Sequence, residues 1–230
     1  MIRRLADRIA EFFFPRRCLL CGRIAADAES VCKDCVRDAA RNHAYMLPPD
    51  PRRRDLYCCT AALIYTGPVR AGILGLKFRE RKGAAAVLAK YMADVRYVNS
   101  MERCDFVTAV PLSRRRLASR GFNQSELIGR AYADYTGKIY LDGVLKKTKE
   151  NQTQSSLGDA KRRVENVKDC YAVCDPEMVR GKRILLVDDV YTTGATIREC
   201  ARVLRRAGAE MVCGLTAATA HGQNAKIYKK

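Results

Sequence analysis

The chain has 230 residues, 48% of them hydrophobic, which is enough for one α/β domain with an ordinary core and a small additional module. Lysine and arginine number 43 against 25 aspartate and glutamate residues, a formal net charge of +18. Such an excess favours polyanionic partners such as nucleic acid, phosphorylated metabolites or acidic lipid surfaces, with a solvated basic face as the alternative. No apolar run approaches the roughly 18–20 residues of a membrane-spanning helix, so we expect no membrane span.

The first residues begin with a basic cluster but are not typical of a signal peptide. They contain no continuous apolar stretch and no small-residue cleavage site. Leu5, Ile9, Phe12 and Phe13 fall instead on one face of an expected amphipathic helix. We therefore expect a cytoplasmic protein.

Four of the eleven cysteines form a pattern of their own. Cys18 and Cys21, and then Cys32 and Cys35, make two CxxC pairs. Each pair presents two thiolates on a tight turn, and two such turns complete a tetrahedral site for a structural Zn²⁺. The alternative is a thioredoxin-like redox pair, which needs a single CxxC at a helix start within a βαβ unit, and neither pair has that context. The sequence thus predicts zinc bound by these four cysteines.

The remaining elements suggest one domain behind this module. We expect the helix and zinc module in residues 1–45, a linker rich in proline and arginine in 46–55, and the main domain in 56–230. Strands and helices alternate in the main domain, which indicates βαβ units and a parallel sheet. Strands are expected at 56–65, 106–110, 171–174, 183–187 and 211–218; helices at 69–78, 84–98, 124–135 and 195–207; a basic loop at 112–123; and a weakly packed polar stretch at 145–167.

The run from residue 184 to residue 196, ILLVDDVYTTGAT, has the pattern of a ribose-phosphate site. Four apolar residues indicate a buried strand, and Asp188 and Asp189 follow at its carboxyl end, where ligands lie in open α/β sheets. Adjacent acids are costly there unless donors or a cation meet them, and the hydroxyls of a ribose supply two donors. A small-residue turn then leads into a helix whose free N–H groups cradle a phosphate. This turn consists of Thr192, Thr193, Gly194, Ala195 and Thr196.

The alternative for this run is an ordinary strand end followed by a capped turn. That interpretation would suit a three-residue fragment. The combination of apolar strand, two acids, two spacers and a threonine-rich turn is more specific, so we favour the ligand site.

The segment resembles the signature of the type I phosphoribosyltransferases, which bind phosphoribosyl pyrophosphate (PRPP) with Mg²⁺. The resemblance implies that Asp188 and Asp189 hold the ribose hydroxyls and that the turn from Thr192 to Thr196 holds the 5′-phosphate. Purine-salvage members carry an acid just before the Thr-Gly of this turn, where this chain has Thr192. That departure argues against salvage of oxopurines, but orotate-type and amido-type relatives lack the acid too.

The same resemblance places a pyrophosphate loop after the strand at 106–110, at Pro111, Leu112 and Ser113. Arg114 and Arg120, in the basic run beyond it, would bind the same pyrophosphate, because guanidinium groups suit phosphate oxygens. The alternatives for this run are a solvated loop and a nucleic-acid patch.

A four-cysteine module ahead of such a domain, with RGFNQ at 120–124 and GLKF at 75–78, resembles the ComF family. That family includes proteins needed for the uptake of transforming DNA. The resemblance implies an α/β fold, with a parallel sheet of the type I phosphoribosyltransferase kind flanked by helices, and a small N-terminal zinc-binding module. It also places an acceptor near Phe122, Asn123, Gln124 and Gln154.

Two functions from different classes follow. The first is an enzyme that transfers ribose 5-phosphate from PRPP to a nucleophile and releases pyrophosphate, acting in DNA uptake and natural transformation or in nucleotide metabolism. The second is a module that senses PRPP and binds single-stranded DNA, acting with DNA-uptake proteins. The chain has no Trp, so contacts to phosphates would outweigh base stacking in such a module.

Overall fold

The protein is described by a computed structural model over residues 16–25, 30–41, 43–47, 55–78, 81–95, 101–149 and 166–220. Residue 41 and residues 43–47 are described by their backbone alone. The helix expected around residues 5–13 and the candidate acceptor residue Gln154 lie outside these ranges. None of the described helices is both long enough and apolar enough to span a bilayer.

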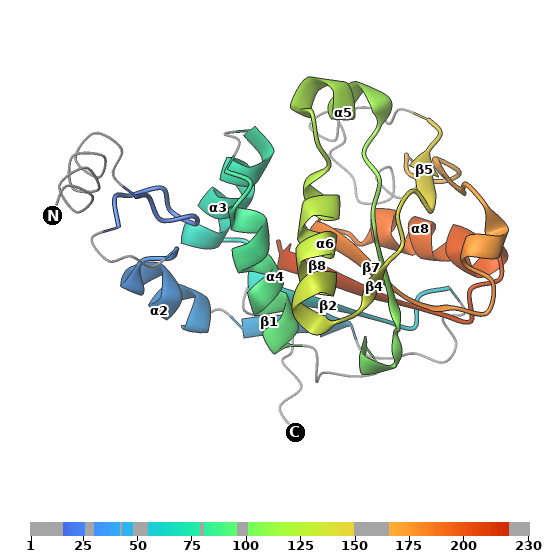
Figure 1. Ribbon diagram of the computed structural model, residues 1–230, viewed down its shortest axis with the longest axis horizontal. Coiled ribbons are helices and arrows are strands. Elements are labelled where there is room, and N and C mark those ends of the chain that lie inside the picture. The colour runs from blue at the N-terminus through green and yellow to red at the C-terminus, as the bar shows by residue number, and fades with distance from the viewer. Residues whose placement is uncertain are drawn as a thin grey trace, which may run out of the picture.

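A single sheet forms the centre of the fold (Figure 1). Its strands in the described ranges are β1 (His43–Leu47), β2 (Cys58–Ile64), β3 (Phe106–Ala109), β4 (Ile139–Tyr140), β7 (Arg183–Tyr191) and β8 (Met211–Thr219). They lie in the order β1-β2-β8-β7-β3-β4, with β1 antiparallel to β2 and every other neighbour parallel. The central strands β7 and β8 are apolar and buried along most of their length, as expected for a parallel sheet covered on both faces.

Helices cover both faces of this sheet (Figure 1). One face carries α3 (Gly67–Phe78), α4 (Ala84–Asp94) and α6 (Gln124–Thr136), and the other carries α8 (Ala195–Arg206). Alternate residues of β7 divide between these layers, because successive side chains of a strand point to opposite faces. Leu185 packs in the cluster with α3, α4 and α6, while Ile184 packs in the cluster with α8.

Smaller elements lie at the edges of the fold. Two short strands, β5 (Leu145–Lys147) and β6 (Tyr171–Val173), pair antiparallel as a second sheet. The helix α5 (Arg114–Arg120) projects beyond the ends of the sheet strands (Figure 1). The other elements are α2 (Lys33–Arg41) and the 3₁₀ turns η1 (Met101–Arg103) and η3 (Pro176–Met178).

The predicted fold class is confirmed: a parallel sheet of the phosphoribosyltransferase type, flanked by helices, follows a cysteine-rich N-terminal segment. The strands and helices expected from residue 56 onwards are found within a few residues of their predicted bounds, the helix predicted at 84–98 being described to Asp94. Residues 43–47 add the antiparallel strand β1 to the sheet, so part of the expected linker region takes part in it. The predicted domain boundaries remain a prediction.

The expectation of a basic loop at 112–123 is wrong, because residues Arg114–Arg120 form α5. Ser113 caps this helix by accepting a hydrogen bond from the Arg116 backbone N–H, and Gly121 ends it in the left-handed conformation at φ 75°. None of the residues in α5 is buried. The helix therefore has no buried apolar face, and the periodic apolar residues that would have predicted it are missing from its sequence.

The polar stretch expected at 145–167 also differs in its described part. Leu145 begins strand β5 and is buried, and Val167 is buried in the cluster with α8. Both ends of the stretch are therefore packed against the domain. Residues 150–165 lie outside the described ranges.

Candidate functional site

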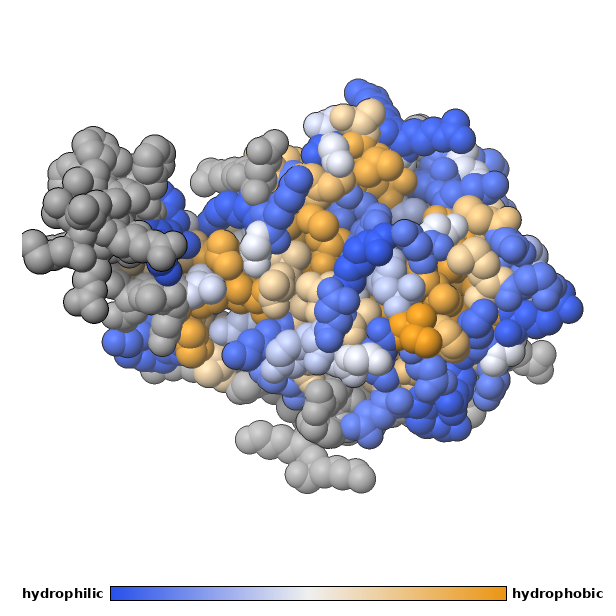
Figure 2. Space-filling view, in the orientation of Figure 1, coloured by the Kyte–Doolittle hydropathy of each residue, from blue (hydrophilic) through white to orange (hydrophobic). Residues whose placement is uncertain are grey.

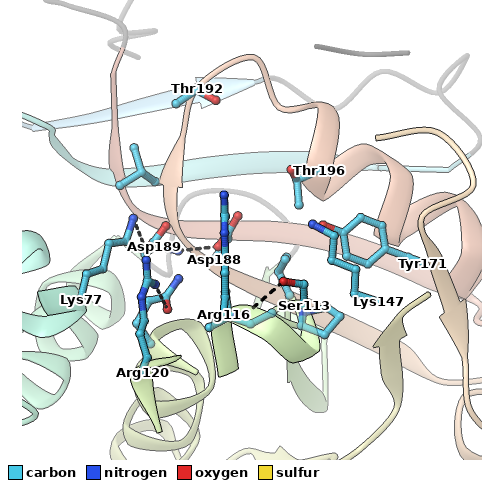
Figure 3. A pocket seen from close by; sticks show the side chains of 15 residues that line it. Lys77, Ser113, Arg116, Arg120, Lys147, Tyr171, Asp188, Asp189, Thr192 and Thr196 are labelled. Carbon is cyan, nitrogen blue, oxygen red and sulfur yellow. Dashed lines mark hydrogen bonds and ion pairs between the residues drawn. The ribbon is translucent and has the colours of Figure 1, made fainter. Parts of the chain in front are cut away.

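A cavity of about 190 Å³ lies at the carboxyl ends of β3 and β7 (Figure 3). It brings together nine predicted site residues, namely Pro111, Leu112, Ser113, Arg120, Gln124, Asp188, Asp189, Thr192 and Thr196. It is also lined by six residues that the sequence analysis did not assign: Lys77, Val110, Arg116, Lys147, Tyr171 and Val190. Thr193, Gly194, Ala195 and Phe122 are not among the lining residues, and Arg114 and Asn123 line a second cavity described below.

The two acids lie within a strand rather than after it. β7 continues to Tyr191 alongside β8, whereas the last residue of β3 that pairs with β7 is Ala109, opposite Val187. Asp188 and Asp189 therefore follow the point where β3 ends. On the β8 side the sheet is continuous, and on the β3 side the missing neighbour leaves room for the cavity.

Asp188 is held by two hydrogen bonds to the same carboxylate oxygen. Ser125 Oγ donates to Asp188 Oδ1 at 2.8 Å, and the backbone N–H of Asp189 donates to it at 2.9 Å. Burial nevertheless raises the pKa of Asp188 to about 7, and the charge of Asp189 adds to the rise, while both hydrogen bonds and Lys77 oppose it. The surroundings of this carboxyl thus favour its protonated form more than water does.

Asp189 is paired with a lysine from a distant part of the chain. Lys77 Nζ, from the last turn of α3, lies 2.5 Å from Asp189 Oδ2, and the two side chains are 18% and 7% exposed. Desolvation is the largest single effect on the pKa of the Lys77 ammonium and lowers it, but the charge and hydrogen bond of Asp189, together with the charge of Asp188, outweigh it, so the net shift is upward. In Figure 3, Lys77 enters the cavity from the side opposite Lys147 and Tyr171.

The RGFNQ segment builds the wall beneath the acids. Asn123 caps α6 by accepting from the Ser125 backbone N–H at 3.1 Å, and its Nδ2 donates to the Val110 carbonyl at 2.9 Å. Arg120 Nη1 donates to Gln124 Oε1 at 2.8 Å, and burial lowers the pKa of Arg120. These bonds tie the start of α6 to the end of β3. The predicted contacts of Phe122, Asn123 and Gln124 with an acceptor remain predictions.

The threonine-rich turn requires its glycine. Gly194 has φ 72°, and a Cβ added there would lie 2.4 Å from the Tyr191 hydroxyl, so no larger residue fits without a shift. Thr193 Oγ1 accepts from the Ala195 N–H at 3.3 Å, which leads the chain into α8. Thr192 and Thr196 line the cavity. The first turn of α8 therefore borders a cavity suited to an anion, because a helix N-terminus favours negative charge.

A second cavity of about 640 Å³ adjoins the first. The two share Pro111, Leu112, Ser113 and Lys147, and the second extends between α5 and β5. Its further lining residues include the cations Arg114, Lys146 and Lys149, the apolar Leu117 and Leu145, and the polar Asn123 and Glu126. In Figure 2, hydrophilic residues lie along the outer edge of α5 and over the β5 region, with hydrophobic residues below α5.

The four predicted zinc ligands lie together in the N-terminal segment. Their sulfur atoms are all within 4.8 Å of one another, with Sγ–Sγ distances of 3.7 Å for Cys18–Cys35, 3.8 Å for Cys21–Cys32 and 3.4 Å for Cys32–Cys35. In a tetrahedral site with Zn–S bonds of about 2.3 Å, neighbouring sulfurs are about 3.8 Å apart. The observed cluster fits a Zn²⁺ ion with thiolates at all four corners.

Models of two known families match the chain. The phosphoribosyl transferase domain matches residues 125–230, and the double zinc ribbon domain matches residues 9–45. Together with the sheet and the cysteine cluster, these matches define a phosphoribosyltransferase-type domain preceded by a structural zinc ribbon. The class of protein is thereby established.

Individual relatives narrow this class. The DNA utilization protein YhgH of Salmonella typhimurium is 31% identical over 204 residues, covering 85% of this chain and 86% of the relative. Competence protein ComFC of Bacillus subtilis is 28% identical over 196 residues, covering 83% and 72%. The chain belongs to the ComF family. A solved structure, glutamine PRPP amidotransferase from B. subtilis complexed with ADP and GMP, aligns with a TM-score of 0.41 and 27% identity over 60% of this chain and 26% of that one.

The zinc cluster leads to a first prediction. Replacing Cys18 with Ser removes one thiolate from the site, and we expect bound zinc to fall from about one ion per chain to near zero, together with a lower melting temperature. Elemental analysis and thermal unfolding measure both. The matched control is Cys174→Ser, which changes an exposed thiol outside the cluster and should retain zinc and stability. Retention of zinc by the Cys18 variant would contradict the assignment.

The raised pKa of Asp188 leads to a second prediction. Between pH 3.8 and about 7 the folded protein keeps a proton that the unfolded chain has released, so stability falls as the pH rises through this window. Asp188→Asn keeps an oxygen to accept from Ser125 but buries no charge. The difference in melting temperature between this variant and wild type should therefore increase from about pH 5 to about pH 8. The increase is roughly 2–4 °C for each kcal/mol by which burial of the charge destabilises the wild type.

The control for this comparison is Asp94→Asn, which changes an exposed acid on α4. Its melting temperature relative to wild type should stay the same at both pH values. A constant offset for the Asp188 variant across the same range would show that its carboxyl is not costly in the folded state.

Proposed function

We propose that the first cavity binds PRPP. Asp188 and Asp189 accept hydrogen bonds from the two ribose hydroxyls, and the turn from Thr192 to Thr196, with the start of α8, binds the 5′-phosphate. The observation that carries this proposal is the cavity itself, which places the half-buried carboxyl of Asp188, the buried carboxyl of Asp189 and a helix N-terminus around one space of about 190 Å³. Ribose 5-phosphate has hydroxyl donors on its ring, which suit the carboxyl groups, and a phosphate anion at C5, which suits the helix N-terminus.

The pyrophosphate is proposed to lie on the side of Ser113, Arg116 and Arg120. All three line the cavity, and the two guanidinium groups come from successive turns of α5. Arginine suits this role because its planar donors bind phosphate oxygens in pairs. Lys147 adds a cation from the opposite wall.

Mg²⁺ is expected to accompany the ligand. Asp188 and Asp189 are the acidic side chains among the described lining residues, and carboxylate oxygens are ligands that Mg²⁺ accepts, so they would hold it directly or through water. The ion supplies positive charge to the pyrophosphate when it is bound.

The proposed reaction is transfer of ribose 5-phosphate to a nucleophile. The bond from ribose C1 to the pyrophosphate oxygen breaks, a bond from the nucleophile to C1 forms, and pyrophosphate leaves with the electron pair, its charge met by Arg116 and Arg120. We propose the second cavity for the acceptor, because it adjoins the first across Ser113. The names of the relatives support a role in DNA uptake or use. The four cysteines must stay reduced to bind zinc, and this favours the cytoplasm as the location of the protein.

A third prediction tests the pocket. PRPP with Mg²⁺, at millimolar concentration, should raise the melting temperature of the wild-type protein, because a ligand that binds only the folded state stabilises it. The double variant Asp188→Ala with Asp189→Ala should lose this shift. Ribose 5-phosphate and pyrophosphate, tested separately, report on the two halves of the site. An unchanged melting curve for wild type would refute PRPP binding.

Catalysis is tested on the same protein. Release of pyrophosphate over time with a panel of nucleobases and amines would establish transfer. Binding of PRPP without release, over the whole panel, would establish the sensing function instead.

A second candidate function is the binding of single-stranded DNA beside this pocket. Phe78, at the end of α3, is 67% exposed, and the Arg120 guanidinium lies 4.9 Å from its ring centroid. The Lys82 ammonium lies 5.0 Å from the ring of Phe122. Aromatic rings next to cations are the elements with which proteins bind single strands without reading sequence.

A fourth prediction follows for an oligo-dT strand measured by fluorescence anisotropy. Phe78→Ala should weaken binding by roughly 5–100-fold, the range of a lost base stack. The affinity of wild type should fall steeply with salt, as phosphate contacts require. Tyr135→Ala removes an aromatic ring that is 55% exposed on another element and is the matched control. Equal losses in both variants would argue against the Phe78 site.

A further inference from the structure

The segment that contributes Lys77 is not part of the matched phosphoribosyl transferase domain. That match begins at residue 125, whereas Lys77 belongs to α3, which follows the zinc ribbon and β2 in the chain. Yet Lys77 lines the cavity from one side, and its ammonium pairs with Asp189 at 2.5 Å (Figure 3). The position of α3 therefore decides whether the pocket has this charge.

The zinc ribbon packs tightly against α3. A Cβ added at Gly72 would lie 2.7 Å from Leu20 Cδ2 and 3.2 Å from Leu20 Cα, so helix and ribbon meet almost at backbone distance. Leu20 lies between two zinc ligands, Cys18 and Cys21, and is fully buried. A change in the shape of this CxxC turn would therefore move α3 directly.

Arg81 links the same two elements by hydrogen bonds. Its Nη1 donates to the Leu20 carbonyl at 3.2 Å, and its Nη2 donates to the Ala71 carbonyl at 3.0 Å. A Cβ at Gly75 would lie 2.3 Å from the Arg81 guanidinium, so α3 must have glycine there to admit the link. Two residues along an α-helix turn the side-chain direction by about 200°. Lys77 therefore leaves α3 on the face opposite Gly75 and the ribbon.

We propose that Lys77 binds the phosphate groups of the ligand in the first cavity, and that the zinc ribbon holds it there through α3. This rests on the proposed function of the cavity. An ammonium has three donors, of which Asp189 takes one, so Lys77 can neutralise Asp189 and contact a ligand phosphate at the same time. The N-terminal module thereby completes the binding site, and the ribbon determines the affinity of a pocket that it does not line.

The experiment measures PRPP binding, with Mg²⁺, by isothermal titration calorimetry on the full-length zinc-loaded protein. Lys77→Met keeps the aliphatic stem and removes the charge, and should weaken binding by about 10–100-fold, the equivalent of one charge-assisted hydrogen bond. Lys77→Arg should restore part of the loss. Lys90→Met, which removes an exposed lysine from α4, is the matched control and should leave the affinity unchanged.

The contribution of the ribbon is tested by a double-mutant cycle. Arg81→Gln removes the guanidinium link without touching a zinc ligand, and should weaken PRPP binding while zinc content stays at the wild-type value. Combined with Lys77→Met, it should cause little further loss, because both changes act through the same ammonium. Gly72→Val provides a second perturbation of the contact, should Arg81→Gln destabilise the fold.

The possible results separate the two proposals. If wild type does not bind PRPP, the proposed function fails first. If wild type binds and Lys77→Met binds equally well, the role of Lys77 is refuted and the function stands. If the losses caused by Lys77→Met and Arg81→Gln multiply, the ribbon does not act through Lys77.

Discussion

The placement of two adjacent carboxylates in β7, one buried and one half-buried, is the constraint around which the site is organised. A lone ionised carboxylate at such a place costs several kcal/mol, about the whole margin by which a domain is stable. Two helices from one face of the sheet offset that cost: α6 supplies the Ser125 hydroxyl to Asp188, and α3 supplies the Lys77 ammonium to Asp189. α6 approaches closely because it has Gly129 where a Cβ would lie 3.0 Å from the ring of Tyr140.

The parts of the site that could be predicted are those whose signal is local. The apolar strand, the two acids and the threonine-rich turn into α8 follow one another within thirteen residues, and two CxxC pairs suffice to indicate zinc, so the sequence predicts both sites. Ser125 and Lys147 carry no such signal, and the GLKF segment indicated the family without giving Lys77 a role, since these side chains reach the cavity from α6, β5 and α3 only after the domain has folded. α5 was missed for a different reason: its caps define it, and no apolar face does.

The basic composition is distributed in a way that composition alone does not show. Several cations rest on aromatic rings of the chain itself, with Arg130 over Tyr140 at 4.6 Å, Lys147 over Tyr171 at 5.4 Å and Lys182 over Phe106 at 5.4 Å. In each pair a cation lies over one face of the ring, as Arg120 does over Phe78, but the ring of Phe78 is 67% exposed. In a chain without Trp, the stacking surface left for a nucleobase is small, and the exposed ring of Phe78 is the clearest part of it within the described residues.

The close fit of Gly75 against the Arg81 guanidinium has a consequence for how the family can evolve. A side chain at position 75 is incompatible with the observed position of the Arg81 guanidinium, and one of the two carbonyls to which Arg81 donates, that of Leu20, belongs to the ribbon. The residues at positions 75 and 81 should therefore change together. In descendants that have lost the ribbon, glycine at 75 and arginine at 81 should both cease to be favoured. Loss of the module would then leave its trace inside α3, in the part of the chain that remains.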